Sequence, residues 1–207
     1  LQRAVTNLAE IFAPLIPAII VGGLLLGFRS VLGDIAMVDG KSLAATYTWC
    51  QGLYDFLWLI CEAALHLLPV GIVWSITKKM GTTQILGIVT GLTLVSSQLV
   101  NAYSVGTTES IPFWDFGLFT VERVGYQSQI IPAILVGFTL VYLEKFFTKI
   151  TPQSIRMIVV PLCSLVPTVF LAHAVLGPIG WAIGQGISNV VLAGFQSPLG
   201  WLMGGLY

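Results

Sequence analysis

The chain has 207 residues, nine acidic and nine basic side chains, and therefore a formal net charge of zero. Only 9% of its residues are charged, whereas soluble domains carry about 25%. Hydrophobic residues make up 56% of the chain, and its mean hydropathy is +0.92. This composition excludes a disordered chain and an ordinary cytosolic enzyme, and the balanced charge excludes nucleic acid as a partner. We therefore expect an all-α integral membrane protein.

Five apolar stretches are long enough to cross a bilayer as helices, at a rise of about 1.5 Å per residue. They are residues 11–28, 52–76, 85–100, 130–147 and 157–179. Two pairs of glycines, Gly23 with Gly27 and Gly87 with Gly91, have the spacing that lets another helix approach closely.

Residues 181–195 show a different pattern. Apolar side chains recur there at helical spacing, while Gln185, Ser188 and Asn189 share the opposite side. The stretch is short and polar for a span, so it predicts an amphipathic helix that lies in the membrane interface or re-enters the protein interior. Residues 113–121 fit either a short hairpin or an interfacial segment, and their aromatic side chains favour the second. The expected fold is thus about five transmembrane helices plus an interfacial helix.

The basic residues orient the predicted spans. With the N-terminus in the cytoplasm, the inner side holds Arg3, Lys78, Lys79, Lys145, Lys149 and Arg156. The outer side then holds Arg29, Lys41 and Arg123. Because positive charge concentrates on the cytoplasmic side of membrane proteins, the pattern favours a cytoplasmic N-terminus. Glu144, next to Lys145, is expected at a solvated helix end.

The second predicted span carries Asp55, Glu62 and His66, at spacings that place them on one helix face with Trp58. Ionisable groups inside a span are costly and usually face a cavity or a partner. In one interpretation they line a substrate path in which Trp58 stacks on a sugar ring. In the other, Asp55 lies at the membrane surface while Glu62 and His66 pair with each other. The sequence leaves both interpretations open.

A second candidate site lies at residues 122–129, just before the fourth span. The amides and hydroxyls of Gln127, Ser128 and Gln129, which follow Tyr126, suit sugar hydroxyls because these both donate and accept hydrogen bonds. The alternative is a helix N-terminus that is capped by side-chain oxygens.

The sequence predicts no cofactor and no metal. His173 stands alone in an apolar span and is expected to be a buried structural residue, because no further ligands are spaced to help it hold a metal. Cys50, Cys61 and Cys163 form no CxxC pair and are expected as small apolar core residues. Since phosphate-binding loops and nucleophile elbows are also missing, the chain alone is not expected to be catalytic.

Several short runs of sequence form a recognisable set. They are Ile11–Phe28, Tyr54–Trp58, Leu68–Ile72, Lys78–Gly81, Ile85–Gly87, Gly125–Gly137 and Gly177–Gly180. Together they resemble the membrane component of sugar phosphotransferase systems of the glucose superfamily. Within that family the chain is most similar to the trehalose-specific branch. That likeness is carried by Gln98–Tyr103, Phe113–Gly117, Val160–Leu165 and Phe170–Pro178.

The resemblance implies a homodimeric permease in the lipid of the bacterial inner membrane, which binds a sugar from outside, occludes it and presents it inward. A phosphocysteine on a partner domain, supplied by upstream phosphocarrier proteins, would then phosphorylate the sugar. For the trehalose branch the product is trehalose 6-phosphate, and the full-length protein would be a phosphohistidine-dependent sugar phosphotransferase. Residues 1–207 would be the N-terminal portion of its permease domain, and none of the three cysteines matches the active-site motif.

The resemblance also places the main sugar-binding His and Glu of the family past residue 207, with the His a few residues after a motif like Gly205–Tyr207. The candidate sugar-binding residues of this chain are therefore Tyr207, Glu62, Tyr126 and Gln127. Two other functions remain as alternatives. One is an ion-coupled secondary sugar transporter, and the other is a dimer scaffold without direct sugar contact.

Overall fold

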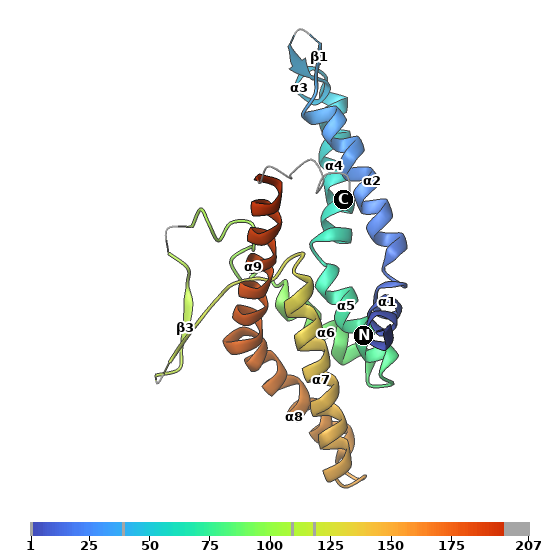
Figure 1. Ribbon diagram of the computed structural model, residues 1–207, viewed down its shortest axis with the longest axis vertical. Helices are drawn as coiled ribbons and strands as arrows, with labels where there is room; N and C mark the ends of the chain where they lie inside the picture. The colour runs from blue at the N-terminus through green and yellow to red at the C-terminus, as the bar shows by residue number, and fades with distance from the viewer. Residues whose placement is uncertain (1, 39, 109, 118, 197–207) are drawn as a thin grey trace.

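The computed structural model describes residues 2–38, 40–108, 110–117 and 119–196. Its helices are α1 (Gln2–Phe12), α2 (Ile16–Gly33), α3 (Leu43–Thr46), α4 (Thr48–Leu65), α5 (Leu68–Lys79), α6 (Gln84–Leu94), α7 (Ile130–Ile150), α8 (Arg156–Leu171), the π-helical turn η1 (Ala172–Leu176) and α9 (Gly177–Gln196). Two antiparallel hairpins pair β1 (Ala36–Val38) with β2 (Lys41–Ser42) and β3 (Phe113–Asp115) with β4 (Thr120–Glu122). In Figure 1, α2 and α4 form a long pair that ends in the first hairpin, beside a bundle formed by α5 to α9.

Four helical segments of the described chain are long and apolar enough to cross a membrane. They are Ile16–Gly33, Thr48–Lys79, Ile130–Ile150 and Arg156–Gly194. Each overlaps a predicted span, so the expected all-α membrane architecture is confirmed.

The stretch at 85–100 forms a shorter helix than the sequence predicts. α6 has 11 residues and ends at Leu94, which makes it about 16 Å long, too short to cross a bilayer. The Val95 N–H bonds to the Leu92 carbonyl instead of continuing the helix. The Ser96 hydroxyl then accepts a hydrogen bond from the Gln98 N–H (3.3 Å), and such local bonds compete with a helix.

The helix predicted at 181–195 exists, but it is not a separate element. α8, η1 and α9 follow one another without a break, so the helix continues the span predicted at 157–179. Pro178 is the second residue of α9, just after the π turn, and the helix continues through it. The π turn accommodates an extra residue between α8 and α9. Its position relative to the membrane interface stays a prediction.

Two glycines bring α5 and α6 together. A Cβ on Gly91 would lie 2.5 Å from the Cα of Val70, and one on Gly87 would lie 2.5 Å from the Oγ1 of Thr77. The two helices therefore pack at backbone distance, as the glycine spacing predicts. A Cβ on Gly23 or on Gly27 would meet no described atom within 4 Å. That face of α2 is thus open in the single chain.

The apolar core lies where α5, α6 and α7 meet. Its fully buried side chains on these helices are Ile72, Val73, Ile76, Leu94, Ala133, Val136, Leu140 and Val141. Tyr126, from the segment that precedes α7, belongs to the same cluster. The core therefore reaches the irregular part of the chain and fixes the position of that aromatic ring.

Glu144 is buried, which corrects the expectation of a solvated helix end. Its Oε1 accepts hydrogen bonds from the N–H (2.9 Å) and the Oγ1 (2.5 Å) of Thr83, the N-cap residue of α6. A carboxylate at this position satisfies an orphan N–H and complements the helix dipole. Glu144 also continues the buried stripe of Leu140 and Val141 along α7, whereas Lys145 is exposed.

Replacing Gly91 with alanine should destabilise the protein, because the new Cβ would force α5 and α6 apart, at a cost of about 1–3 kcal/mol. Gly52→Ala in α4 is the matched control, since a Cβ there meets no described atom within 4 Å and alanine favours a helix. Thermal unfolding of the full-length protein in detergent should show a lower midpoint for Gly91→Ala. Equal midpoints for the two variants would contradict the close packing.

Candidate functional site

The segment between α6 and α7 has little regular structure, but hydrogen bonds fix its backbone. The Tyr126 N–H donates to the Leu94 carbonyl at the end of α6 (2.8 Å). Within the segment, the Val100 N–H donates to the Arg123 carbonyl, and the Gly125 N–H donates to the Val100 carbonyl (both 2.8 Å). These bonds fold the segment back on itself, so Tyr126 enters the core beside the end of α6.

The middle of this segment is the hairpin of β3 and β4, although the aromatic side chains of residues 113–121 favoured an interfacial segment. Its position relative to the membrane interface stays a prediction. The paired residues are Phe113 with Glu122, Trp114 with Val121, and Asp115 with Thr120. The Asp115 carboxylate accepts a hydrogen bond from the Gly117 N–H (2.7 Å), and Gly117 has a φ of +82°, which suits glycine. Phe116 and Phe119 stack on each other and pack edge-on against Phe170 of α8. The hairpin is therefore attached to the membrane-spanning segment.

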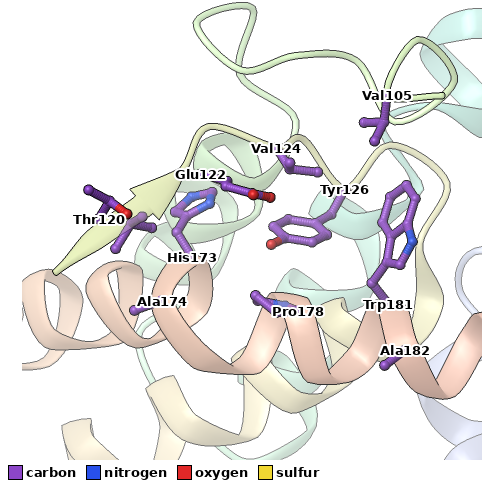
Figure 2. A pocket seen from close by; sticks show the side chains of 11 residues that line it. Val105, Thr120, Glu122, Val124, Tyr126, His173, Ala174, Pro178, Trp181 and Ala182 are labelled. Carbon is purple, nitrogen blue, oxygen red and sulfur yellow. The ribbon is translucent and has the colours of Figure 1, made fainter. Parts of the chain in front are cut away.

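A cavity of about 450 Å³ lies between β4, Tyr126 and α9 (Figure 2). It is lined by Val105, Thr120, Val121, Glu122, Val124, Tyr126, His173, Ala174, Pro178, Trp181 and Ala182. Small-molecule sites have volumes of about 300–1,000 Å³, mostly apolar walls and a few polar groups. This cavity has the same character.

Tyr126 is the central residue of the cavity wall. Its ring centroid lies 5.8 Å from that of His173 and 6.5 Å from that of Trp181. A Cβ on Gly177 would overlap the phenol group, so glycine is needed there. Burial, and to a smaller extent the Glu122 carboxylate, raise the pKa of Tyr126 to about 12. The hydroxyl therefore stays protonated near neutral pH and is able to donate a hydrogen bond to a ligand.

His173 lies on the π turn η1. Turns of this kind are rare in proteins overall, but they occur often at functional sites. It is buried, as predicted. Its ring is edge-on to Trp114 of β3, with the centroids 5.7 Å apart. Its Nδ1 has no hydrogen-bond partner among the described residues. His173 therefore joins the hairpin, the π turn and the ring of Tyr126 in one wall.

The residues predicted to bind sugar do not come together in one place. Tyr126 lines the cavity, but the amide Oε1 of Gln127 is buried and accepts a hydrogen bond from the Ala102 N–H (2.9 Å). Glu62 lies in α4, on a different helix. Tyr207 lies outside the described residues. A sugar-binding role for these residues stays a prediction.

The second span brings Glu62 and His66 near each other without a hydrogen bond between them, so the choice between the two interpretations stays open. The Oε1 of Glu62 lies 3.8 Å from the Nδ1 of His66. Asp55 accepts hydrogen bonds from the Nε2 of Gln51 (3.1 and 3.2 Å), one turn earlier in the same helix. The ring of Trp58 is edge-on to His66 at 5.5 Å.

Glu122 lies in the second candidate segment, at residues 122–129, whereas His173 and Trp181 are not among the predicted site residues. The sequence predicts His173 as a structural residue and Trp181 as the start of an interfacial helix. The π turn that brings His173 and Trp181 to the cavity leaves no sequence signal. The chain segment around Glu122 and Tyr126 did carry one, because amides, hydroxyls and an aromatic ring cluster there.

Comparison with known proteins gives a consistent family. The family model described as "Phosphotransferase system, EIIC" matches residues 9–207. The chain is 51% identical over 203 residues to the PTS system trehalose-specific EIIBC component of Escherichia coli (strain K12), and 38% identical over 214 residues to that of Bacillus subtilis (strain 168). These alignments cover 96% and 100% of this chain but 42% and 46% of the relatives.

The PTS system sucrose-specific EIIBC component of Pasteurella multocida (strain Pm70) is 36% identical over 211 residues, which are 100% of this chain and 44% of that protein. The chain thus spans less than half the length of these relatives. No solved structure matched the chain.

Gln127→Ala should loosen the segment that precedes the hairpin. It leaves the Ala102 N–H without its acceptor, at a cost of about 1–3 kcal/mol. We expect amide hydrogen exchange in a peptide that covers residues 101–105 to become about tenfold faster or more. Gln51→Ala, which removes an exposed amide bonded to Asp55, is the control. If both variants exchange at the wild-type rate, Gln127 does not anchor the segment.

Proposed function

Because the chain belongs to the phosphotransferase system EIIC family, and so is a multi-pass membrane protein, we propose that it forms the N-terminal part of a trehalose permease. The full-length protein takes up trehalose and couples this uptake to formation of trehalose 6-phosphate. The phosphoryl group comes from a phosphocysteine on a cytoplasmic partner domain, which upstream phosphocarrier proteins recharge.

The relatives support trehalose as the sugar. The two relatives described as trehalose-specific are 51% and 38% identical to this chain, and the sucrose-specific relative from Pasteurella multocida is 36% identical. Because the sequence identity is 51% to the trehalose-specific relative from Escherichia coli and 36% to the sucrose-specific relative, trehalose is favoured over sucrose as the sugar. No observation favours an ion-coupled secondary transporter.

The cavity beside Tyr126 is the observation that supports direct sugar contact. A sugar needs partners for hydroxyls that both donate and accept hydrogen bonds, and flat apolar surfaces for its C–H faces. The neutral phenol of Tyr126 and the carboxylate of Glu122 supply a donor and an acceptor. The indole of Trp181 supplies the flat surface. The scaffold alternative predicts no such arrangement.

In this proposal the described residues bind and orient the sugar and do not carry the phosphoryl group. Phosphoryl transfer breaks the bond from sulfur to phosphorus on the partner domain, which releases a cysteine thiolate, and forms a bond from phosphorus to a sugar hydroxyl oxygen, whose proton passes to that thiolate or to water. Excluding water from the bound sugar would prevent loss of the phosphoryl group to hydrolysis. The chain forms a homodimer through apolar faces such as that of Gly23 on α2, which is open in the single chain.

The test uses the full-length protein in inverted bacterial membrane vesicles, with the phosphodonor chain and labelled trehalose. We expect trehalose 6-phosphate to appear when the donor is present and not without it. Uptake that ignores the donor and follows an ion gradient would overturn the phosphotransferase mechanism. Turnover of sucrose and not of trehalose would overturn the substrate.

In the same assay, Tyr126→Phe should raise the KM for trehalose about fivefold, because one neutral hydrogen bond is worth about 0.5–1.5 kcal/mol. Tyr142→Phe on the exposed surface of α7 is the matched control and should leave the KM unchanged. An unchanged KM in Tyr126→Phe would remove this hydroxyl from the sugar site.

We propose that the N-terminus is cytoplasmic. The first hairpin, which carries Lys41, lies at the opposite end of the molecule from the junction of α7 and α8, which carries Lys149 and Arg156 (Figure 1). A cysteine that replaces Lys41 should react with an impermeant maleimide added outside intact cells, and one that replaces Lys149 should react only after lysis. The reverse pattern would invert the topology.

A further inference from the structure

A second cavity, of about 480 Å³, is lined in part by residues of the segment between α6 and α7. Its polar and aromatic lining residues are Trp58, His66, Asn101, Tyr103 and Ser104. Val105, the next residue along the chain, lines the first cavity. The two linings share no residue, so the cavities are distinct.

The rings of Trp58, His66 and Tyr103 lie together in this second cavity and form one aromatic surface. His66 stacks on Tyr103, with the ring centroids 4.9 Å apart and the planes 25° apart, and Trp58 meets His66 edge-on at 5.5 Å. The Arg29 guanidinium lies 4.6 Å from the Trp58 ring centroid and 3.7 Å from that of Tyr54, which holds the indole in place. Trp58 and Tyr103 are 37% and 63% exposed, so the described residues leave part of each side chain uncovered.

The polar groups in the cavity include a buried nitrogen without a partner. The Nδ1 of His66 has no hydrogen-bond partner among the described residues and lies 3.8 Å from the Oε1 of Glu62, beyond hydrogen-bond distance. The amide oxygen of Asn101 already accepts a hydrogen bond from the Tyr103 N–H (3.0 Å), so its NH2 group is the part left for a ligand, and Ser104 contributes a hydroxyl. This set combines donors and acceptors with aromatic surface, which suits a ligand rich in hydroxyl groups.

Hydrogen bonds of Ser128, in the segment that carries Tyr126, also fix residues that line the second cavity. Ser128 has a φ of +59°, an uncommon conformation for a residue other than glycine. Its hydroxyl donates to the Leu65 carbonyl (3.1 Å) and accepts a hydrogen bond from the Tyr103 hydroxyl (2.8 Å). Its N–H donates to the His66 carbonyl (3.3 Å). These bonds seat Tyr103 over His66 and fix the shape of the cavity.

We propose that this cavity is a second carbohydrate site, which takes one sugar ring of a neutral saccharide against Trp58 and Tyr103. The inference rests on the proposed function, because it takes trehalose as the saccharide. The chain would then bind two trehalose molecules, one beside Tyr126 and one beside His66.

Equilibrium dialysis of the purified full-length protein with labelled trehalose, carried to saturation, tests the proposal. We expect two trehalose molecules per chain in the wild-type protein and one per chain in Trp58→Ala. Donor-dependent phosphorylation by Trp58→Ala should persist at saturating trehalose, since the Tyr126 cavity is unchanged. Trp58→Phe keeps an aromatic surface and should restore the second molecule.

Trp49→Ala is the matched control, because Trp49 lies on the same helix α4, is well exposed and lines neither cavity. It should keep two bound molecules. One molecule per chain in the wild-type protein would overturn the second site, whether or not any variant folds. Two molecules per chain in Trp58→Ala would also overturn it. No binding and no phosphorylation of trehalose at all would instead contradict the proposed function.

Discussion

The structure depends on how an irregular segment satisfies its backbone hydrogen bonds beside membrane-crossing helices. Polar backbone groups that lack partners are very costly in a bilayer, so non-helical chain is tolerated there only against protein or water. Residues between α6 and α7, which pack against these helices, satisfy several of their backbone groups by hydrogen bonds to the helices and to one another. The Tyr126 N–H donates to the carbonyl that ends α6, and the Ser128 N–H donates to the carbonyl of His66 at the end of α4.

The short α6 makes this arrangement possible. Because α6 ends at Leu94, its last carbonyl is free to accept from Tyr126, and the ring of Tyr126 enters the core beside α5 and α7. Gly177 then allows the start of α9 to lie directly against the phenol. The π turn η1 turns His173 toward the same ring. One buried aromatic residue thus joins the core, the hairpin and the last described helix around a cavity.

Much of the fold follows from the apolar pattern, because membrane helices are long and satisfy their own backbone. The four crossing segments and the close approach at Gly91 were predictable for that reason. The end of α6 was not, since Thr90 and Thr93 look as compatible with a helix as with its end. The burial of Glu144 was missed because neighbouring lysines suggested water, whereas its partner Thr83 is 61 residues away in sequence.

The candidate site could be predicted only in part, because its residues come from distant segments. The cluster around Tyr126 was visible as a run of hydrogen-bonding side chains before a span. Trp181 reaches the same cavity only because α8 and α9 are continuous across the π turn. Gln127 has the chemistry of a sugar ligand, yet its amide oxygen holds the Ala102 N–H. Residue type alone does not separate these two uses of an amide.

The most direct measurement is the position of trehalose in a cryo-EM structure of the full-length protein. The account predicts density for a sugar ring in the cavity of Figure 2, within hydrogen-bond distance of the Tyr126 hydroxyl and against the indole of Trp181. Bound trehalose with no contact to either residue, in a protein that turns over trehalose, would contradict the central claim that this cavity holds the sugar.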